Sequence, residues 1–245
     1  MSPLTLRHDV LVSHQPAYLP WCGYFSRLLD VGTLLVLDHV QFSERGRQHR
    51  NLIWGPDGPL RLTVPVRRRF GQQLHDVGID SSQPWAAKHW RAITQTYQAA
   101  PFWGRYADGL ADLYARPWTH LLPLTTALTG FLLEAFNMPV QLVSSATLAP
   151  AGAKTSMLID LCRKTGTSVL RVGSGAVRYL DAAALSDAEI SVEVATYSNP
   201  PYPQRRPPFL PNLSALDLLL NRGPAAAEIL RAGAAIDCWP AGVVR

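Results

Sequence analysis

The chain has 245 residues, 47% of them hydrophobic and 17% charged, a composition that excludes intrinsic disorder and supplies enough apolar surface for a sizeable core. Its three cysteines are too few for a disulfide framework, and no Cys/His cluster has the spacing of metal ligands, so the sequence predicts no metal site and a reducing, cytoplasmic location. The formal net charge of +5 allows an anionic partner, but the two short arginine runs, Arg67–Arg69 and Arg205-Arg206, lack interleaved aromatic residues, so we expect no nucleic-acid partner.

The first quarter of the chain predicts a strand, a polar turn, a helix and a second strand. Val10–Ser13 is apolar and β-branched, a helical pattern follows, and Thr33–Leu37 is a second apolar run. The distance between the two runs suits a βαβ crossover with parallel strands. The polar turns after both strands are therefore expected at the carboxyl ends of neighbouring strands, where open α/β sheets bind ligands.

The middle third predicts a short β-unit followed by helices. Leu60–Val66 alternates like a strand and is expected to pair with Asp76–Ile79. Three helices should follow, from near Gln83 to Tyr97, over about 104–115, and over 119–137. The last of these is the most apolar long segment, but it is interrupted by polar residues and falls short of the ~20 residues that a membrane span requires, so we expect no membrane partner.

The remainder repeats the strand–helix–strand order. Val140–Ser145 and Ser168–Val172 are predicted strands on either side of a helix at Lys154–Lys164, and Ile190–Tyr197 is predicted as the final strand. The proline-dense run Pro200–Pro211 is too stiff for a helix or central strand and is expected to be an ordered lid or wrapping segment.

Asn212-Leu213-Ser214 then caps a last predicted helix, which Asn221-Arg222-Gly223 closes. Together these elements predict one α/β domain over 1–245, with a Rossmann-like, mostly parallel sheet, a helical middle segment and a C-terminal helical extension.

His14 is the first candidate for chemistry. A histidine at a strand-to-loop junction beside a proline can be held rigidly and titrates near neutral pH, although a buried histidine satisfied by backbone is the alternative. Asp38 follows the second strand, so it could orient His14, bind a substrate amine or hydroxyl, or cap the next turn.

Further polar residues and one cysteine are weaker candidates. Gln41, Gln48, Arg50 and Asn51 offer amide and guanidinium groups for sugar hydroxyls, carboxylate or phosphate, with a solvated loop as the alternative. Lys88, His89 and Trp90 lie in one helical turn and cannot all face one pocket, so Trp90 is expected in the core, which leaves Lys88 or His89 to contact a ligand. Cys22 is either a thiol nucleophile or a small buried side chain.

A glycine-rich turn, Gly173-Ser174-Gly175, is similar to a phosphate-cradling turn but lacks the rest of any known phosphate-binding motif. The sequence also lacks the HExxH, GxSxG, Walker lysine and HxGH motifs. The common hydrolase, NTPase and adenylyltransferase interpretations therefore have no motif support.

A long motif gives the chain a family resemblance. Residues 14–25 read HQPAYLPWCGYF, residues 37–42 read LDHVQF, and Arg50-Asn51, Lys88-His89-Trp90 and the stretch PNLSALDLL at 211–219 follow. With Lys154, the segment at 158–162, Gly173 and Tyr179-Leu180, the similarity spans nearly the whole chain. The chain thereby resembles the WbqC-like family.

The resemblance implies site residues at the matching positions. The predicted catalytic residues are His14, Asp38, Lys88 and His89. The predicted substrate-binding residues are Gln15, Tyr18, Gln41, Arg50, Asn51, Tyr179, Asn212, Ser214 and Asp217. The chain departs from the family pattern where Val172 and Val177 stand in place of an expected serine and lysine, which points to a different acceptor if those groups touch substrate in relatives.

Members of the family are known mainly from gene clusters for bacterial surface polysaccharide such as O-antigen, with a glycine or aminoacyl transferase role proposed. The abundance of Ala, Arg and Pro indicates a GC-rich gene, so a natural-product pathway is as plausible. We therefore expect a biosynthetic transferase that moves an aminoacyl group from an activated donor onto an amine or hydroxyl of a sugar or small metabolite. His14 is expected to be the general base, and the substrate a nucleotide sugar or a carrier-bound aminoacyl donor.

Two rival functions remain. The first is an ATP-dependent amide-forming ligase, which the Rossmann-like pattern and the glycine-rich turn allow. The second is a non-catalytic module that presents a precursor to partner enzymes. The sequence does not identify a cofactor, so that assignment stays unknown.

Overall fold

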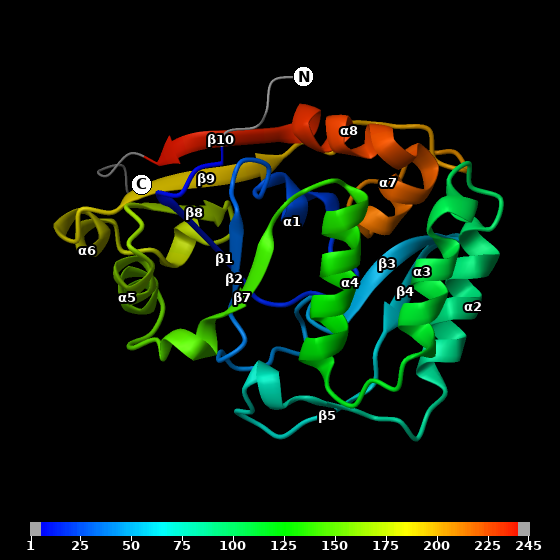
Figure 1. Ribbon diagram of the computed structural model, residues 1–245, viewed down its shortest axis with the longest axis horizontal. Coiled ribbons are helices and arrows are strands. Elements are labelled where there is room, and N and C mark those ends of the chain that lie inside the picture. The colour runs from blue at the N-terminus through cyan, green and yellow to red at the C-terminus, as the bar shows by residue number, and fades with distance from the viewer. Residues whose placement is uncertain (1–5, 240–245) are drawn as a thin grey trace.

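The computed structural model describes residues 6–239, and its centre is a six-stranded sheet (Figure 1). The spatial order of its strands is β10 (Ala234–Trp239), β9 (Ser191–Tyr197), β8 (Val169–Gly173), β1 (Val10–His14), β2 (Thr33–Val36) and β7 (Gln141–Ser144). Every neighbouring pair from β9 to β7 is parallel, and only β10 pairs antiparallel, against β9. The predicted Rossmann-like, mostly parallel sheet is confirmed.

Helices cover both faces of this sheet (Figure 1). The helices of the described residues are α1 (Cys22–Ser26), α2 (Trp85–Tyr97), α3 (Trp103–Ala115), α4 (Leu121–Ala135), α5 (Thr155–Thr165), α6 (Ala182–Asp187), α7 (Ala215–Arg222) and α8 (Ala226–Gly233). Of these, α2 and α3 lie beside the six-stranded sheet and do not cover it (Figure 1). Successive side chains of a strand point to opposite faces, so Val10 and Val12 join the apolar cluster of α4 and α7 while Leu11 joins that of α5. The predicted helical middle segment corresponds to α2, α3 and α4.

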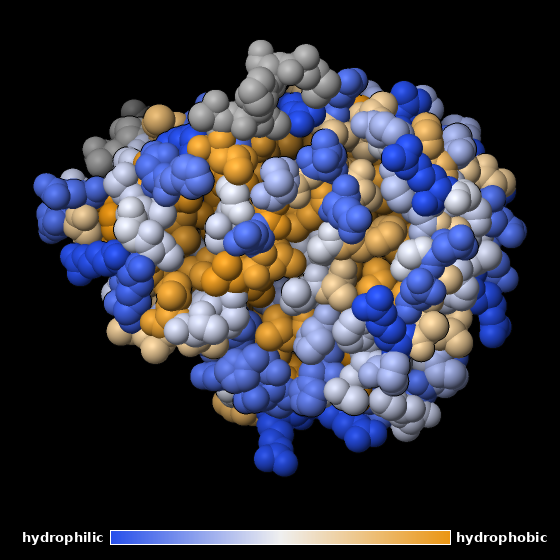
Figure 2. All heavy atoms as spheres, in the orientation of Figure 1, coloured by the Kyte–Doolittle hydropathy of each residue, from blue (hydrophilic) through white to orange (hydrophobic). Residues whose placement is uncertain are grey.

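Short 3₁₀ turns link several elements, at η1 (Leu74–Asp76), η2 (Ser145–Leu148), η3 (Val177–Tyr179) and η4 (Gly223–Ala225). Within residues 6–239, none of the helices combines the length and apolar character that crossing a bilayer requires. Figure 2 shows hydrophobic spheres gathered near the middle of the visible face, over the strands, with hydrophilic spheres around the rim.

The predicted pairing of Leu60–Val66 with Asp76–Ile79 is wrong for most of its length. β4 (Gly58–Thr63) pairs instead with β3 (Arg50–Gly55) as an antiparallel hairpin, and only the two-residue strands β5 (Val66–Arg67) and β6 (Gly78–Ile79) meet as expected. β3 begins with charged and polar residues, so its sequence reads as a loop. Its alternate side chains nevertheless become buried, because α2 and α7 pack against it.

The prediction that Ile190–Tyr197 is the last strand is also wrong. After α8 the chain returns as β10, which pairs with β9 from Ala234 to Trp239 and forms the sheet edge. Most β10 residues are exposed, so the sequence lacks the apolar run that marks a central strand. The predicted C-terminal helical extension is present as α7 and α8, but a strand follows it.

The proline-dense run Pro200–Pro211 contains no helix or strand, as its composition predicts. It is tied to α7 by Tyr202 and Gln204, whose side chains donate to the Asp217 carboxylate at 2.8 and 3.0 Å. The indole of Trp54 donates to the carbonyl oxygen of Arg206 at 3.0 Å, which fixes the segment to the β3–β4 hairpin. The run is an ordered wrapping segment.

Candidate functional site

A crevice of about 670 Å³ opens at the carboxyl ends of β1 and β8. From β1 the chain builds β2 and β7 on one side of the sheet, and it then builds β8 and β9 on the other side. The order in which strands are added to the sheet therefore reverses between the parallel neighbours β1 and β8, and open α/β sheets bind ligands at such a switch point. His14 closes β1 and Gly173 closes β8, and both residues line the crevice.

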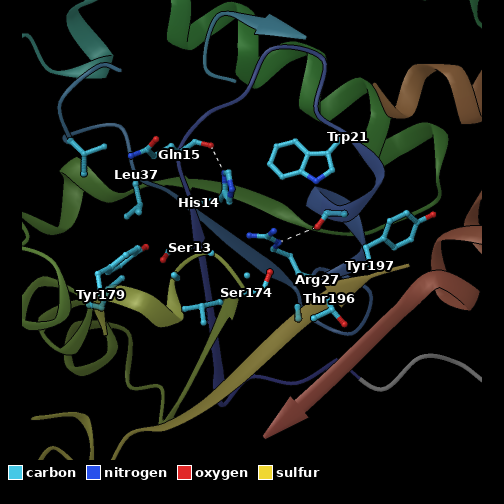
Figure 3. Close-up of a pocket in the computed structure, with 18 of the residues that line it drawn as sticks. Ser13, His14, Gln15, Trp21, Arg27, Leu37, Ser174, Tyr179, Thr196 and Tyr197 are labelled. Atoms are coloured by element: carbon cyan, nitrogen blue, oxygen red, sulfur yellow. Dashed lines mark hydrogen bonds between the residues drawn. The ribbon is translucent and has the colours of Figure 1, made fainter. Parts of the chain in front are cut away.

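His14 lines this crevice (Figure 3). Its Nδ1 atom lies 2.7 Å from the carbonyl oxygen of Gln15, which can only accept, so Nδ1 carries the proton and Nε2 has the lone pair. Tyr24 and Trp21 pack edge-on against the imidazole, with ring centroids 4.8 and 5.6 Å away. These contacts fix the tautomer and the orientation of the ring.

Burial and the nearby charge of Arg27 lower the pKa of His14 to about 3. The imidazole is therefore neutral at pH 7, contrary to the expectation from sequence that it titrates near neutrality. A neutral imidazole with an unprotonated Nε2 can accept a proton. The positive charge of Arg27 disfavours the protonated form of His14, so an anion that compensates Arg27 would make His14 a stronger base.

Arg27 lies at the base of the crevice, just after α1, and is only 9% exposed. Its Nε atom donates to the carbonyl oxygen of Gly23 at 3.2 Å (Figure 3). Across residues 6–239 no carboxylate forms an ion pair with it, and burial lowers the pKa of its guanidinium. The two terminal nitrogens remain available to a ligand.

The glycine-rich turn after β8 forms a second wall. Gly173, Ser174, Gly175 and Ala176 all line the crevice, and Figure 3 shows Ser174 beside the Arg27 side chain. In the described part of the chain, the amides of Ser174 and Gly175 donate to no backbone acceptor. Lys154, which caps α5, lines the same crevice with an exposed side chain and a φ of 52°, unusual for a non-glycine residue.

Four of the residues predicted from sequence line this crevice, namely His14, Gln15, Tyr179 and Asn212. The side-chain oxygen of Gln15 accepts from Gln48 at 2.7 Å, and the backbone oxygen of Asn212 accepts from Arg47 at 3.4 Å. The Arg47 guanidinium also covers the Trp21 ring at 4.7 Å, so Arg47 links the polar loop to the rim of the crevice.

Asp38 does not orient His14. Its buried carboxylate accepts from the hydroxyls of Ser144 and Ser145 at 2.5 and 3.0 Å, and from the amide of Ala146 at 3.0 Å. These hydrogen bonds, more than offsetting burial, lower the pKa of Asp38 and keep it ionised. Its geometry fixes the turn after β7, and the carbonyl of Gln15 takes the orienting role at His14.

Tyr18, Lys88 and His89 lie away from the crevice. The Tyr18 hydroxyl is buried, 2.8 Å from Nδ1 of His89 and 2.5 Å from the hydroxyl of Tyr114. Burial lowers the pKa of His89 to about 4, so its imidazole is neutral within this network. Lys88 is exposed on α2. Of the expected catalytic residues Lys88 and His89, His89 therefore lies in the packed core and Lys88 faces the solvent.

Three further predicted binding residues, Gln41, Arg50 and Asn51, lie outside the crevice. Gln41 is exposed and forms a bridge to Gln73, and Arg50 opens β3. Asn51 is buried and donates to the carbonyl oxygen of Leu19 at 2.5 Å, which holds the loop that carries the Tyr18 side chain. None of these three lines the crevice in the described structure.

Ser214 and Asp217 belong to α7. Ser214 is its N-cap residue and accepts from the amide of Leu216 at 3.2 Å, as its position in the sequence predicts. Asp217 is fully buried and anchors the wrapping segment, and burial raises its pKa. Both residues therefore hold the wall of the site in place and do not line it.

Cys22 is not an activated thiol. It is buried, and burial together with the negative charge of Asp217 raises the pKa of its thiol to about 12. A thiol in this state is protonated at neutral pH, which removes the thiolate that a nucleophilic role requires. The small buried side chain, the alternative considered from sequence, matches the structure.

Sequence reasoning missed Arg27 and did not place Lys154 among the site residues. Arg27 follows a short helix, and nothing local in the sequence marks an arginine that will be buried without a carboxylate. Lys154 belongs to the residues that carry the family resemblance, and it stands at the start of the predicted helix that follows a strand. That position was the feature of the sequence that could have indicated a site residue. No three His, Cys, Asp or Glu side chains in the described ranges gather as a metal site requires.

Comparisons with known proteins give a consistent picture. The profile of the WbqC-like protein family matches residues 15–229, beginning one residue after His14 and including the other predicted site residues. A protein of Mycobacterium tuberculosis named "Uncharacterized protein Rv1507c" is 32% identical over 221 residues, which cover 89% of this chain and 95% of that protein. No solved structure matches the chain.

Proposed function

The chain belongs to the WbqC-like protein family, and from that premise we propose that it is a cytoplasmic biosynthetic acyltransferase. It moves an aminoacyl group, such as glycyl, from an activated thioester or ester donor onto an amine or hydroxyl of a sugar or small metabolite. The observation that carries the proposal is the fixed tautomer of His14, which leaves Nε2 unprotonated on a side chain that lines the crevice at the switch point of the sheet.

In this mechanism, Nε2 of His14 accepts the proton of the attacking amine as its nitrogen bonds to the donor carbonyl carbon. The carbon–sulfur or carbon–oxygen bond to the carrier then breaks. The proton passes from Nε2 to the leaving thiolate or alkoxide, so the imidazole returns to its neutral form. The reaction forms one amide bond, breaks one thioester or ester bond, and needs no oxidant or reductant.

The crevice offers groups to hold the two substrates around His14. Gln15 and the edge of Trp21 lie next to the imidazole, and Tyr179 and Asn212 lie on the walls (Figure 3). Amide and hydroxyl groups of this kind suit the hydroxyls of a sugar, and an indole suits an apolar carrier arm. Arg27 supplies a positive charge for an anionic part of either substrate.

A ligand screen followed by a transfer assay tests this function. Purified protein is first heated with aminoacyl thioesters of pantetheine, amino-sugar nucleotides and ATP with magnesium, because a ligand that binds only the native state raises the melting temperature. The ligands that stabilise are then combined, and the aminoacyl product is measured by mass spectrometry. His14→Gln is compared with His120→Gln, which removes an exposed histidine outside the crevice.

We expect the wild type and His120→Gln to form the amide, and His14→Gln to be slower by at least about 100-fold, the usual loss when a general base is removed. Full activity in His14→Gln contradicts the assigned base. Release of AMP or ADP with product indicates the ligase, and tight binding without any product indicates a presenting module.

A further inference from the structure

The Arg27 side chain carries a buried positive charge. It is 9% exposed, makes one hydrogen bond to the carbonyl oxygen of Gly23, and pairs with no carboxylate among residues 6–239. Taking such a cation out of water is unfavourable unless an anion compensates it. Because Arg27 lines the crevice, a bound ligand can supply that anion.

Gly173 lets the guanidinium lie directly against the strand end. A Cβ atom at this position would lie 3.0 Å from Nη2 of Arg27, tighter than nearly all real Cβ contacts. The residues that follow, Ser174 and Gly175, have backbone N–H groups without a backbone acceptor. A cationic side chain and free amides therefore meet at the carboxyl end of β8.

Lys154 adds a second positive charge from another element. Its side chain is exposed, forms no ion pair with a carboxylate in the described residues, and lines the crevice. Its positive φ of 52° is strained for a residue with a side chain, and strain of this kind tends to occur at functional positions. Arg27, the turn and Lys154 thus come from three separate segments of the chain.

We propose that this part of the crevice is a phosphate subsite, in which Arg27, Lys154 and the amides of Ser174 and Gly175 bind a phosphate or pyrophosphate group of a small-molecule substrate. Donors that line one crevice from several segments suit a tetrahedral dianion better than a planar carboxylate, and two cations match its charge. The inference rests on the proposed function only in taking the crevice as the substrate site.

The surface arginine run is the rival phosphate site. Arg67 and Arg68 already pair with Asp80 and Glu44, and Arg69 is exposed. A phosphate held there would be bound in water, where such contacts contribute little. Arg69 therefore provides a matched control for Arg27, because both are arginines and only one lines the crevice.

The test is titration calorimetry with pyrophosphate, ADP, UDP, glucose 1-phosphate and citrate. We expect the wild type to bind pyrophosphate or one of the phosphorylated compounds. Arg27→Met should weaken that binding by at least about tenfold, the loss of a charge-assisted contact, and Arg69→Met should change it less than about twofold. Tighter binding of a nucleotide than of glucose 1-phosphate identifies a nucleotide source, and the reverse identifies a sugar phosphate.

Gly173→Ala gives a second variant, because its methyl group displaces the guanidinium without removing the charge. It should also weaken pyrophosphate binding, while thermal unfolding verifies that each variant is folded. His14→Gln should retain the binding, so failure of the catalytic proposal and failure of the subsite are distinguishable. The subsite is refuted if pyrophosphate and the phosphorylated compounds do not bind, if citrate binds as tightly, or if Arg69→Met weakens binding as much as Arg27→Met.

Discussion

Arg27 and Arg171 are neighbours, since Nη1 of Arg171 donates to the backbone oxygen of Arg27 at 3.0 Å. Arg171, on β8, is fully buried, and its guanidinium pairs with Asp30 at 2.5 Å and Glu193 at 2.8 Å. Arg27 is almost as buried, but no carboxylate between residues 6 and 239 pairs with it.

The difference separates a structural cation from a binding cation. The ion pairs of Arg171 tie β8 to β9 and to the loop after α1, and Arg7 contributes a further contact to Glu193 at 2.5 Å. The positive charge of Arg171 is therefore compensated by carboxylates of the protein itself. Arg27 has no carboxylate partner in the described residues, and it lines the crevice. Under the proposed function, a substrate binds in that crevice and can supply the compensating negative charge.

The largest expected effect is on stability, from Arg171→Met. Removing this cation leaves the carboxylates of Asp30 and Glu193 without their main partner, and breaking a buried ion pair from one side costs about 3–5 kcal/mol. Urea denaturation followed by circular dichroism measures the loss. A loss below about 1 kcal/mol would show that the Arg171 network is not structural.

Asp217 extends the comparison to a buried charge of the opposite sign. Its carboxylate accepts from Tyr97, Tyr202 and Gln204, so we expect Asp217→Asn to cost about 1–3 kcal/mol in the same denaturation experiment. Tyr202→Phe, which removes one donor only, is the matched control and should cost less.

The pH dependence of the Asp217 variant has a definite sign. Burial raises the folded-state pKa of Asp217, so its contribution to stability is greatest below the ordinary aspartate pKa and is lost as the pH rises through the raised value. The deficit of Asp217→Asn should therefore shrink from about pH 4 towards neutrality. A deficit that grows with pH would contradict the raised pKa.

Arg27→Met should change stability by less than about 1 kcal/mol, or increase it, because the substitution removes a desolvated cation that no carboxylate of residues 6–239 compensates. The backbone oxygen that Arg171 contacts is unaffected by the change. Measured beside Arg171→Met, this variant tests the comparison directly. Equal losses from the two substitutions would mean that Arg27 is also structural.

The smallest expected effect is on proton binding by His14. Because burial and then Arg27 lower the pKa of His14 to about 3, Arg27→Met should raise it, though not to the ordinary value near 6.5. Nuclear magnetic resonance of ¹⁵N-labelled histidine measures the titration. His49, whose pKa of about 4 results from burial and Arg50, is the internal control and should not respond.

The sign of the stability effect at His14 follows from the same shift. A lowered pKa means that His14 contributes stability above about pH 6.5, which is lost as the pH falls towards 3. Arg27→Met should weaken this acid sensitivity. Pyrophosphate should also raise the pKa of His14 if it compensates the charge of Arg27. If the titration of His14 is unchanged in the presence of pyrophosphate, the bound phosphate does not act on the electrostatics of His14.

Much of the fold could be predicted because its signals are local. The apolar runs at β1, β2 and β8 and the helical periodicity of α2 to α5 need only neighbouring residues to be recognised. The hairpin at β3 and the edge strand β10 could not be predicted in this way. Their residues are polar or exposed, and their strand conformation depends on a partner elsewhere in the chain.

The candidate site was only partly predictable. The motif that contains His14 and Gln15 marks the end of β1, and both residues line the crevice. The same motif contains Tyr18, which points into a buried network with His89. Residue type and spacing indicate that a polar group matters, but they do not separate a group that contacts ligand from one that holds the loop.

The sequence by itself determined the parallel α/β architecture and the polar turn at the end of its first strand, because periodicity and turn chemistry are properties of short segments. The tertiary structure decided that β8 lies beside β1 and that Asp38 holds the turn after β7. It also decided that, within the described residues, Arg171 has two carboxylate partners and Arg27 has none. Strand order and charge compensation depend on contacts between distant residues, and no local pattern encodes them.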